Sequence, residues 1–205
     1  MKTKFSIILA LFSFYFANAQ QEDQVNSEMN SAKGITFAHG DMFVEGALQI
    51  ATGGDRDFYA FNPKFGYFLN DKFAVGGQIS FSSDKYESTD TKTNIFGIGG
   101  FARYYVLELD KKRFKAYGEA GLGYGRNKVE DPTGSDDSNS LTANINVGLN
   151  YFVTKNIAVT FVLANLLSYN SVSPENGPSS NTFELNINLF NNIFDQPKFG
   201  LLYKF

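Results

Sequence analysis

The chain has 205 residues, a formal net charge of −3 and no cysteine, which excludes a disulfide framework and a basic surface for nucleic acid. Aromatic residues make up 16% of the chain, yet the mean hydropathy is only −0.22, and no segment after the N-terminus is apolar enough for a spanning helix. This excludes a helical membrane protein but not a transmembrane β-barrel, whose strands alternate apolar and polar residues.

The first residues have the pattern of a secretory signal peptide. Lys2 and Lys4 precede an apolar run from Phe5 to Phe16, and Ala17-Asn18-Ala19 forms a small-x-small cleavage site. The run has about a dozen residues, whereas a membrane anchor helix needs roughly 20. We therefore expect a signal peptide at 1–19, cleavage after Ala19 and export through the Sec pathway.

Residues 20–40 are polar and show no clear period, so we expect them to form a flexible N-terminal segment of the mature chain. From Asp41 onward the apolar residues recur at every second position, as in strands that have one apolar face. Each alternating span has about the length of a tilted membrane strand. The approximate spans are 42–52, 57–69, 73–82, 93–106, 114–126, 140–153 and 157–168.

The connections between these spans alternate in length. Residues 70–72 and 154–156 are tight, and 107–113 is a little longer, whereas 83–92, 127–139 and 169–181 are long and polar. The first outer connection, at 53–56, is an exception because it is short. Short periplasmic turns and long external loops are typical of bacterial outer-membrane barrels.

The end of the chain leaves two paths open. Residues 183–189 and 198–205 alternate well, and 191–197 interrupts them. We expect one final strand ending at Phe205, with either a bulge near 195–197 or a loop hairpin before it. The predicted fold is an all-β, antiparallel, up-and-down transmembrane barrel of about eight strands that covers 41–205.

Tyrosines recur at equivalent places in this pattern. Residues 67–75 and 151–159 form an internal repeat, and Tyr104 begins a similar motif before the middle turn. In equivalent hairpins, Tyr67, Tyr104 and Tyr151 would lie at one height and face outward. We therefore predict that they form an aromatic girdle at the periplasmic interface, where amphipathic rings are favoured.

The last residues carry the family resemblance. Phe199, Leu201, Tyr203 and Phe205 occupy every second position, and the pattern ends on an aromatic residue. This resembles the C-terminal signal of outer-membrane proteins that is read by the barrel-assembly machinery. The chain as a whole is similar to the outer membrane protein beta-barrel domain family, the small OmpA- and OmpX-like barrels. Its Ala17–Gln20 junction and its ending look like the Bacteroidetes branch. The resemblance implies the fold and an outer-membrane location, and it implies little about activity.

The central hairpin allows a register to be predicted. If the turn is centred at Lys111, Arg103 faces Glu119 on a face that we assign to the barrel interior because it carries both charges. Two interpretations remain open: a packed polar core, or a narrow water path gated by the Arg103–Glu119 pair. The same register predicts the inward pairs Phe101–Gly121, Gly99–Gly123 and Gly97–Gly125, and the outward pairs Ala102–Ala120 and Ile98–Tyr124.

No catalytic, cofactor or metal site is predicted. The only histidine is His39, at the edge of the barrel, so a Ser–His arrangement on strands or outer loops is not available. Acidic residues Glu130, Asp131, Asp136 and Asp137 match no calcium loop and indicate a solvated loop.

Three functions are consistent with the sequence. The leading hypothesis is an integral outer-membrane barrel with a structural or surface-interaction role and no catalysis. We expect it to be monomeric and to contact membrane lipid, lipopolysaccharide and the assembly machinery, with its loops available to an extracellular ligand. The alternatives are a narrow passive pore for small solutes and a soluble, lipocalin-like periplasmic barrel that binds an apolar ligand.

Overall fold

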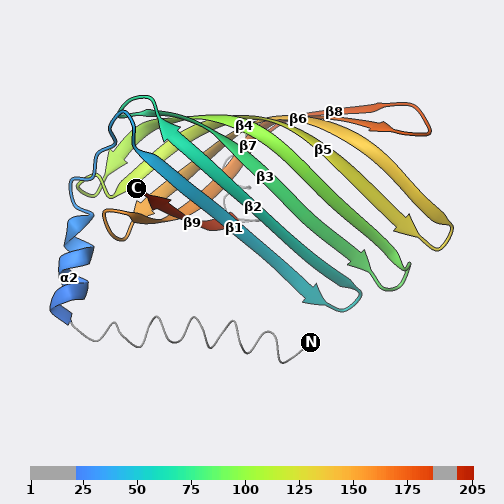
Figure 1. Ribbon diagram of the computed structural model, residues 1–205, viewed down its shortest axis with the longest axis horizontal. Coiled ribbons are helices and arrows are strands. Elements are labelled where there is room, and N and C mark those ends of the chain that lie inside the picture. The colour runs from blue at the N-terminus through green and yellow to red at the C-terminus, as the bar shows by residue number, and fades with distance from the viewer. Residues whose placement is uncertain (1–21, 187–197) are drawn as a thin grey trace.

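The computed structural model describes residues 22–186 and 198–205 and confirms the predicted barrel (Figure 1). The seven strands between residues 42 and 174 pair in sequence order, and the strand at 198–204 pairs with both the first and the seventh of them, which closes an antiparallel ring of eight strands. In the described residues, no helix is long and apolar enough to span a membrane. The elements are α2 (Glu22–Ser31), β1 (Met42–Gly53), β2 (Arg56–Phe68), β3 (Phe73–Tyr86), β4 (Thr91–Leu109), β5 (Phe114–Asp131), β6 (Gly134–Phe152), β7 (Ile157–Pro174), β8 (Ser180–Leu185) and β9 (Lys198–Lys204).

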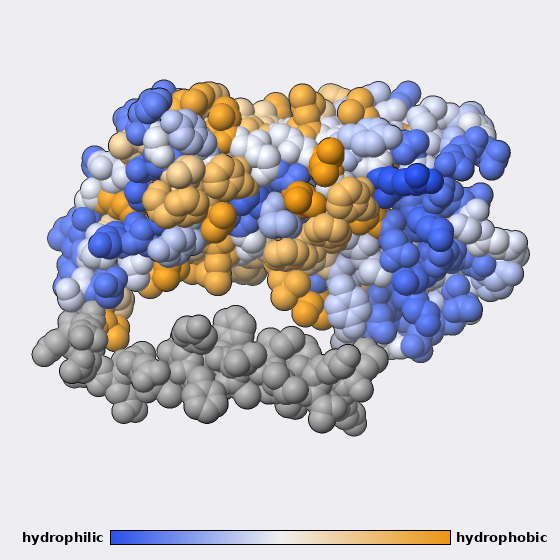
Figure 2. Space-filling model, in the orientation of Figure 1, coloured by the Kyte–Doolittle hydropathy of each residue, from blue (hydrophilic) through white to orange (hydrophobic). Residues whose placement is uncertain are grey.

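The outer surface of the barrel is apolar and its interior is polar. Outward-facing side chains such as Leu48, Ile98, Leu122 and Leu201 are between 56% and 65% exposed, whereas Arg103 and its partners are buried inside. Figure 2 shows hydrophobic residues gathered over the middle of the barrel and hydrophilic residues toward its ends. A soluble lipocalin-like barrel needs the reverse arrangement, so that alternative is wrong.

The strands are longer than the alternation of apolar residues predicted. The segments 83–92, 127–139 and 169–181, expected as long loops, are largely paired backbone, because β3, β5 and β7 run on to Tyr86, Asp131 and Pro174. The apolar period stops where a strand leaves the membrane, since both faces then meet water, but the hydrogen-bonded ladder continues. We call this end the outer end, and the end with the turns at 69–72, 110–113 and 153–156 the periplasmic end.

The final strand is formed by two segments along one edge of β7. Because β6 pairs with β7 from Ala158 to Pro174, β8 and β9 both lie on the other edge. β8 pairs with the outer part of β7, where Leu167 faces Leu185, and β9 pairs with its periplasmic part. The bulge expected near 195–197, one of the two predicted paths, lies outside the described residues.

The N-terminal segment differs from the irregular chain expected at 20–40. Residues 22–31 form α2, and Ala32, Ile35 and Phe37 are buried at the periplasmic end of the barrel. These few apolar residues give no period in the sequence, and only the closed barrel provides the surface that buries them. The predicted signal peptide and its cleavage after Ala19 lie outside the described residues.

Candidate functional site

The barrel interior is the candidate site, and glycines on β4 and β5 make room in it. The register is the one predicted from the turn, with Gly97 opposite Gly125, Gly99 opposite Gly123 and Arg103 opposite Glu119. Polar side chains of neighbouring strands lie across these glycines. A Cβ added at Gly121 would lie 2.6 Å from Asn144 Oδ1, and one at Gly97 would lie 2.6 Å from Ser80 Oγ. The missing side chains therefore let β3 and β6 line this wall with hydroxyl and amide groups.

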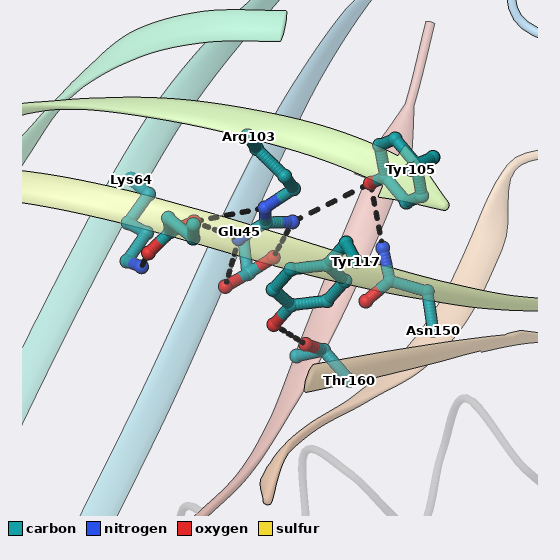
Figure 3. Close-up of polar contacts among 8 residues, drawn as sticks. Glu45, Lys64, Arg103, Tyr105, Tyr117, Asn150 and Thr160 are labelled. Atoms are coloured by element: carbon teal, nitrogen blue, oxygen red, sulfur yellow. Dashed lines mark hydrogen bonds and ion pairs between the residues drawn. The ribbon is translucent and has the colours of Figure 1, made fainter. Parts of the chain in front are cut away.

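An ion-pair network crosses the interior (Figure 3). The Arg103 side chain is fully buried and donates to both oxygens of Glu45, with Nη1 2.7 Å from Oε2 and Nη2 3.1 Å from Oε1. It also donates to Glu119 Oε2 from Nε at 2.8 Å and from Nη2 at 2.6 Å. Lys64 Nζ pairs with the other Glu119 oxygen. The network balances two carboxylates with two cations, which is what makes buried charge tolerable.

Sequence reasoning placed Arg103 beside Glu119 but missed Glu45 and Lys64 as their partners. Both lie on inward faces and are opposite each other on β1 and β2. Strand register predicts contacts only between neighbouring strands. Glu45 on β1 meets Arg103 on β4 because the closed wall curves and brings the two strands to face each other across the lumen. The sequence did carry one indication: Glu45 and Lys64 are inward-facing charges of opposite sign, and buried charges need partners.

Tyrosines hold the guanidinium in place from the periplasmic side. The Tyr117 ring centroid lies 4.0 Å from Arg103 Cζ, and its hydroxyl is 3.4 Å from that of Thr160. The Tyr105 hydroxyl accepts from Asn150 Nδ2 at 2.9 Å and lies 3.5 Å from Arg103 Nη1. A cation over a desolvated aromatic face is favourable, so the rings add to the carboxylates in fixing this charge.

Below the network the interior becomes an aromatic layer. Phe43, Phe68, Tyr105, Tyr117 and Phe152 are at most 2% exposed and form one cluster with other buried apolar residues. On the outer side of the network, a cavity of about 830 Å³ is lined by many polar side chains from several strands and by apolar ones such as Val162 and Ala164. Its lining includes Asn62, Gln78, Ser80, Thr142, Asn144 and Asn146. The interior is therefore a vestibule that opens toward the outer end. At its periplasmic side it is closed first by the ion-pair network and then by the packed aromatic rings.

The outer end carries exposed ion pairs on the polar extensions of the strands. The Arg56 guanidinium donates two hydrogen bonds to Asp84, at 2.8 and 2.7 Å, which lowers the pKa of that carboxyl. The hydroxyl and backbone N–H of Thr133 likewise lower the pKa of Asp131 in the β5–β6 turn. The acidic residues at 130–137 thus belong to a paired hairpin and its turn. Within the described residues, no group of three or more acidic or histidine side chains is arranged to hold a metal ion.

The predicted girdle and assembly residues all lie on the outer face of the wall, and the three tyrosines lie near its periplasmic end. Tyr67 pairs with Val75, Tyr104 with Phe73, and Tyr151 with Val159, each close to a periplasmic turn. The outward row at the C-terminus is 56%, 62%, 48% and 49% exposed in the order Phe199, Leu201, Tyr203 and Phe205.

Comparison with models of known protein families identifies the family of this chain. The model of the outer membrane protein beta-barrel domain family matches residues 6–189. The chain belongs to this family. It is accordingly an outer-membrane β-barrel protein, as its apolar outer surface requires.

Solved barrels of this kind share the architecture at low identity. Neisserial surface protein A is 18% identical with a TM-score of 0.50, over 82% of this chain and 98% of that one. A major outer membrane protein from Thermus thermophilus is 12% identical with a TM-score of 0.50, over 81% and 99% of the two chains. At these identities the likeness establishes the fold alone. No curated protein matches the chain.

Proposed function

We propose that this family member is a sealed, non-catalytic barrel with a structural or surface-interaction role in the outer membrane. The observation that carries the proposal is the interior. A charge-balanced network centred on the buried Arg103 lies directly above an aromatic layer. A side-chain-filled interior is usual for about eight strands. The polar hairpins at the outer end are then the parts available to lipopolysaccharide, neighbouring surfaces or an extracellular ligand.

Ion conductance tests the sealed interior. The full-length protein is folded into lipid vesicles, and folding is verified by the change in gel mobility on boiling. We expect planar bilayers containing the folded protein to show no conductance above that of the protein-free bilayer. Reproducible discrete steps would overturn the proposal and favour a narrow pore.

The pore remains the second candidate because of the vestibule. Its polar lining and volume of about 830 Å³ offer a water-filled entrance from the outer end down to Glu45 and Lys64. A path would then require only that the ion pairs and the rings below them rearrange. Conductance that rises when Arg103 and Glu119 are both replaced by alanine, compared with that of the unaltered protein, would identify that gate.

The non-catalytic part of the proposal rests on the place of His39. Its ring lies 5.9 Å from that of Tyr67, on the exposed periplasmic segment before β1 and away from the vestibule. Lipid-A and phospholipid hydrolysis assays should therefore show no activity above that of a barrel refolded from a His39→Ala variant. Activity that is lost in this variant would contradict the proposal.

We also propose that the outward row ending at Phe205 is the assembly signal and that the protein is a monomer. Phe205→Ala should slow insertion in vesicles that contain the barrel-assembly machinery and leave spontaneous folding into detergent unchanged. Phe183→Ala is the matched control, because that ring is 63% exposed but lies outside the row. Equal effects of the two substitutions on assisted insertion would refute this role.

A further inference from the structure

The segment before β1 alternates between buried and exposed side chains. Ala32, Ile35 and Phe37 are 0%, 8% and 4% exposed, whereas Thr36 and Ala38 are exposed. The glycines on either side of the buried residues Ile35 and Phe37 have positive φ, +77° at position 34 and +96° at position 40, which allows the chain to turn at both ends. The stretch thus has one face toward the barrel, although it belongs to no strand.

Backbone contacts tie this segment to the strand ends around the periplasmic mouth. Gly34 N donates to the carbonyl of Lys111 at 2.6 Å in the β4–β5 turn, and Gly40 N donates to that of Phe68 at 3.0 Å at the end of β2. Lys155 N in the β6–β7 turn donates to Ser31 Oγ at 3.1 Å. Residues 32–41, which we call the strap, therefore cross the periplasmic mouth and are fixed to it at several points. Figure 1 shows their course between α2 and β1.

Phe37 occupies the centre of this mouth. Its ring centroid lies 4.0 Å from that of Phe68, 4.8 Å from that of Tyr105 and 5.8 Å from that of Phe152, which come from β2, β4 and β6. Lys115 Nζ, from β5, lies 4.6 Å from the Phe37 ring centroid and pairs with Glu108. The Phe37 side chain, which belongs to no strand, thus contacts residues from four strands of the wall: β2, β4, β5 and β6.

We propose that residues 32–41 act as a periplasmic stopper, which closes the barrel from below independently of the ion-pair network. Two seals then lie in series: the charged network in the wall, and the Phe37 layer supplied by the N-terminal segment. The proposal rests on the sealed-barrel function above and assigns part of that seal to a segment outside the strands. The two seals meet at Tyr105, whose hydroxyl lies 3.5 Å from Arg103 Nη1 and whose ring packs against Phe37. The charged side chains and the Phe37 ring are otherwise separate, so loss of either one alone should leave the barrel closed.

Cysteine accessibility tests whether the segment is docked in the folded protein. The chain has no native cysteine, so Ile35→Cys and Thr36→Cys each provide a single thiol on opposite faces of the strap. In folded protein we expect a water-soluble maleimide to label the buried position at least ~100-fold more slowly than the exposed one, because labelling there requires local opening of the docked segment. In denaturant the two rates should be similar. Similar rates in the folded protein would overturn the stopper.

Ion flux in vesicles tests whether the docked segment seals. Arg103→Ala with Glu119→Ala removes one charge of each sign from the network, and Phe37→Ala removes the stopper ring. We expect each change alone to leave vesicles tight and the combination to leak. The control for the combination carries Arg103→Ala, Glu119→Ala and Thr36→Ala in place of Phe37→Ala, and it should stay tight.

Other results of the flux experiment would contradict either the stopper or the sealed-barrel function on which it rests. A network variant that leaks as fast as the combination would show that the stopper does not seal. A combination that stays tight, with folding verified by gel mobility, would assign the periplasmic seal to the other rings. Leakage by the unaltered protein would instead contradict the sealed-barrel function.

Discussion

Replacing Arg103 by methionine should strongly destabilise the folded barrel. The fully buried guanidinium donates to two carboxylates at distances of 2.6 to 3.1 Å. Without it, Glu45 and Glu119 share the single cation of Lys64, and one buried negative charge remains uncompensated. Breaking a buried ion pair by removing one partner costs about 3–5 kcal/mol. We expect a loss of this size in the free energy of unfolding.

A second substitution separates the charge from the packing. In the double variant Arg103→Met with Glu45→Gln, Lys64 and Glu119 remain balanced, so at least half of the lost free energy should return. The chain has no tryptophan, and urea unfolding in lipid vesicles is therefore followed by circular dichroism or gel mobility. Lys85→Met, at an exposed lysine, controls for the loss of a cation and should change stability by less than about 0.5 kcal/mol. A double variant no more stable than Arg103→Met would refute the reasoning.

Further predictions test the faces, the close contacts and the periplasmic girdle. Val147→Arg, on the lipid-facing side of β6, should cost about 2–4 kcal/mol in vesicle unfolding, while the inward Asn146→Ser should be nearly silent; equal effects would contradict the assigned faces. Gly76→Ala should cost about 1–3 kcal/mol, because a Cβ there would lie 2.1 Å from the Phe65 carbonyl oxygen, whereas Gly118→Ala has nothing within 4 Å and should be tolerated in the same assay. If Tyr104 is part of a girdle, Tyr104→Ala should weaken stability in vesicles more than in detergent, and an equal loss in both would argue against that role.

The register of the central hairpin could be predicted because it depends on local information. Alternation assigns each residue of β4 and β5 to a face, and a turn centred at Lys111 correctly predicts Arg103 opposite Glu119. Next to the turn the pairing is shifted by one residue, with Leu109 opposite Phe114, because a bulge lies between Tyr105 and Leu107. The same logic assigned the faces of Asn146 and Val147. It could not extend to Glu45, because no rule of pairing between neighbours relates β1 to β4 across the lumen.

The outer hairpins were misjudged for a related physical reason. The hydrophobic period marks only the part of a strand that meets lipid, and it vanishes along 127–139 although β5 and β6 remain paired there up to Asp131 and Gly134. Backbone hydrogen bonds, which continue the ladder into water, leave no trace in the pattern of side chains.

The sequence by itself determined the class of fold, the inward and outward faces and the membrane environment, because the period of two is a property of each strand alone. Only the tertiary structure decided that Glu45 meets Arg103 across the lumen and that Phe37 enters the periplasmic mouth of the barrel. Both depend on closure. Once the strands form a ring, curvature brings β1 toward β4, and the ring creates an aromatic socket that no single strand possesses.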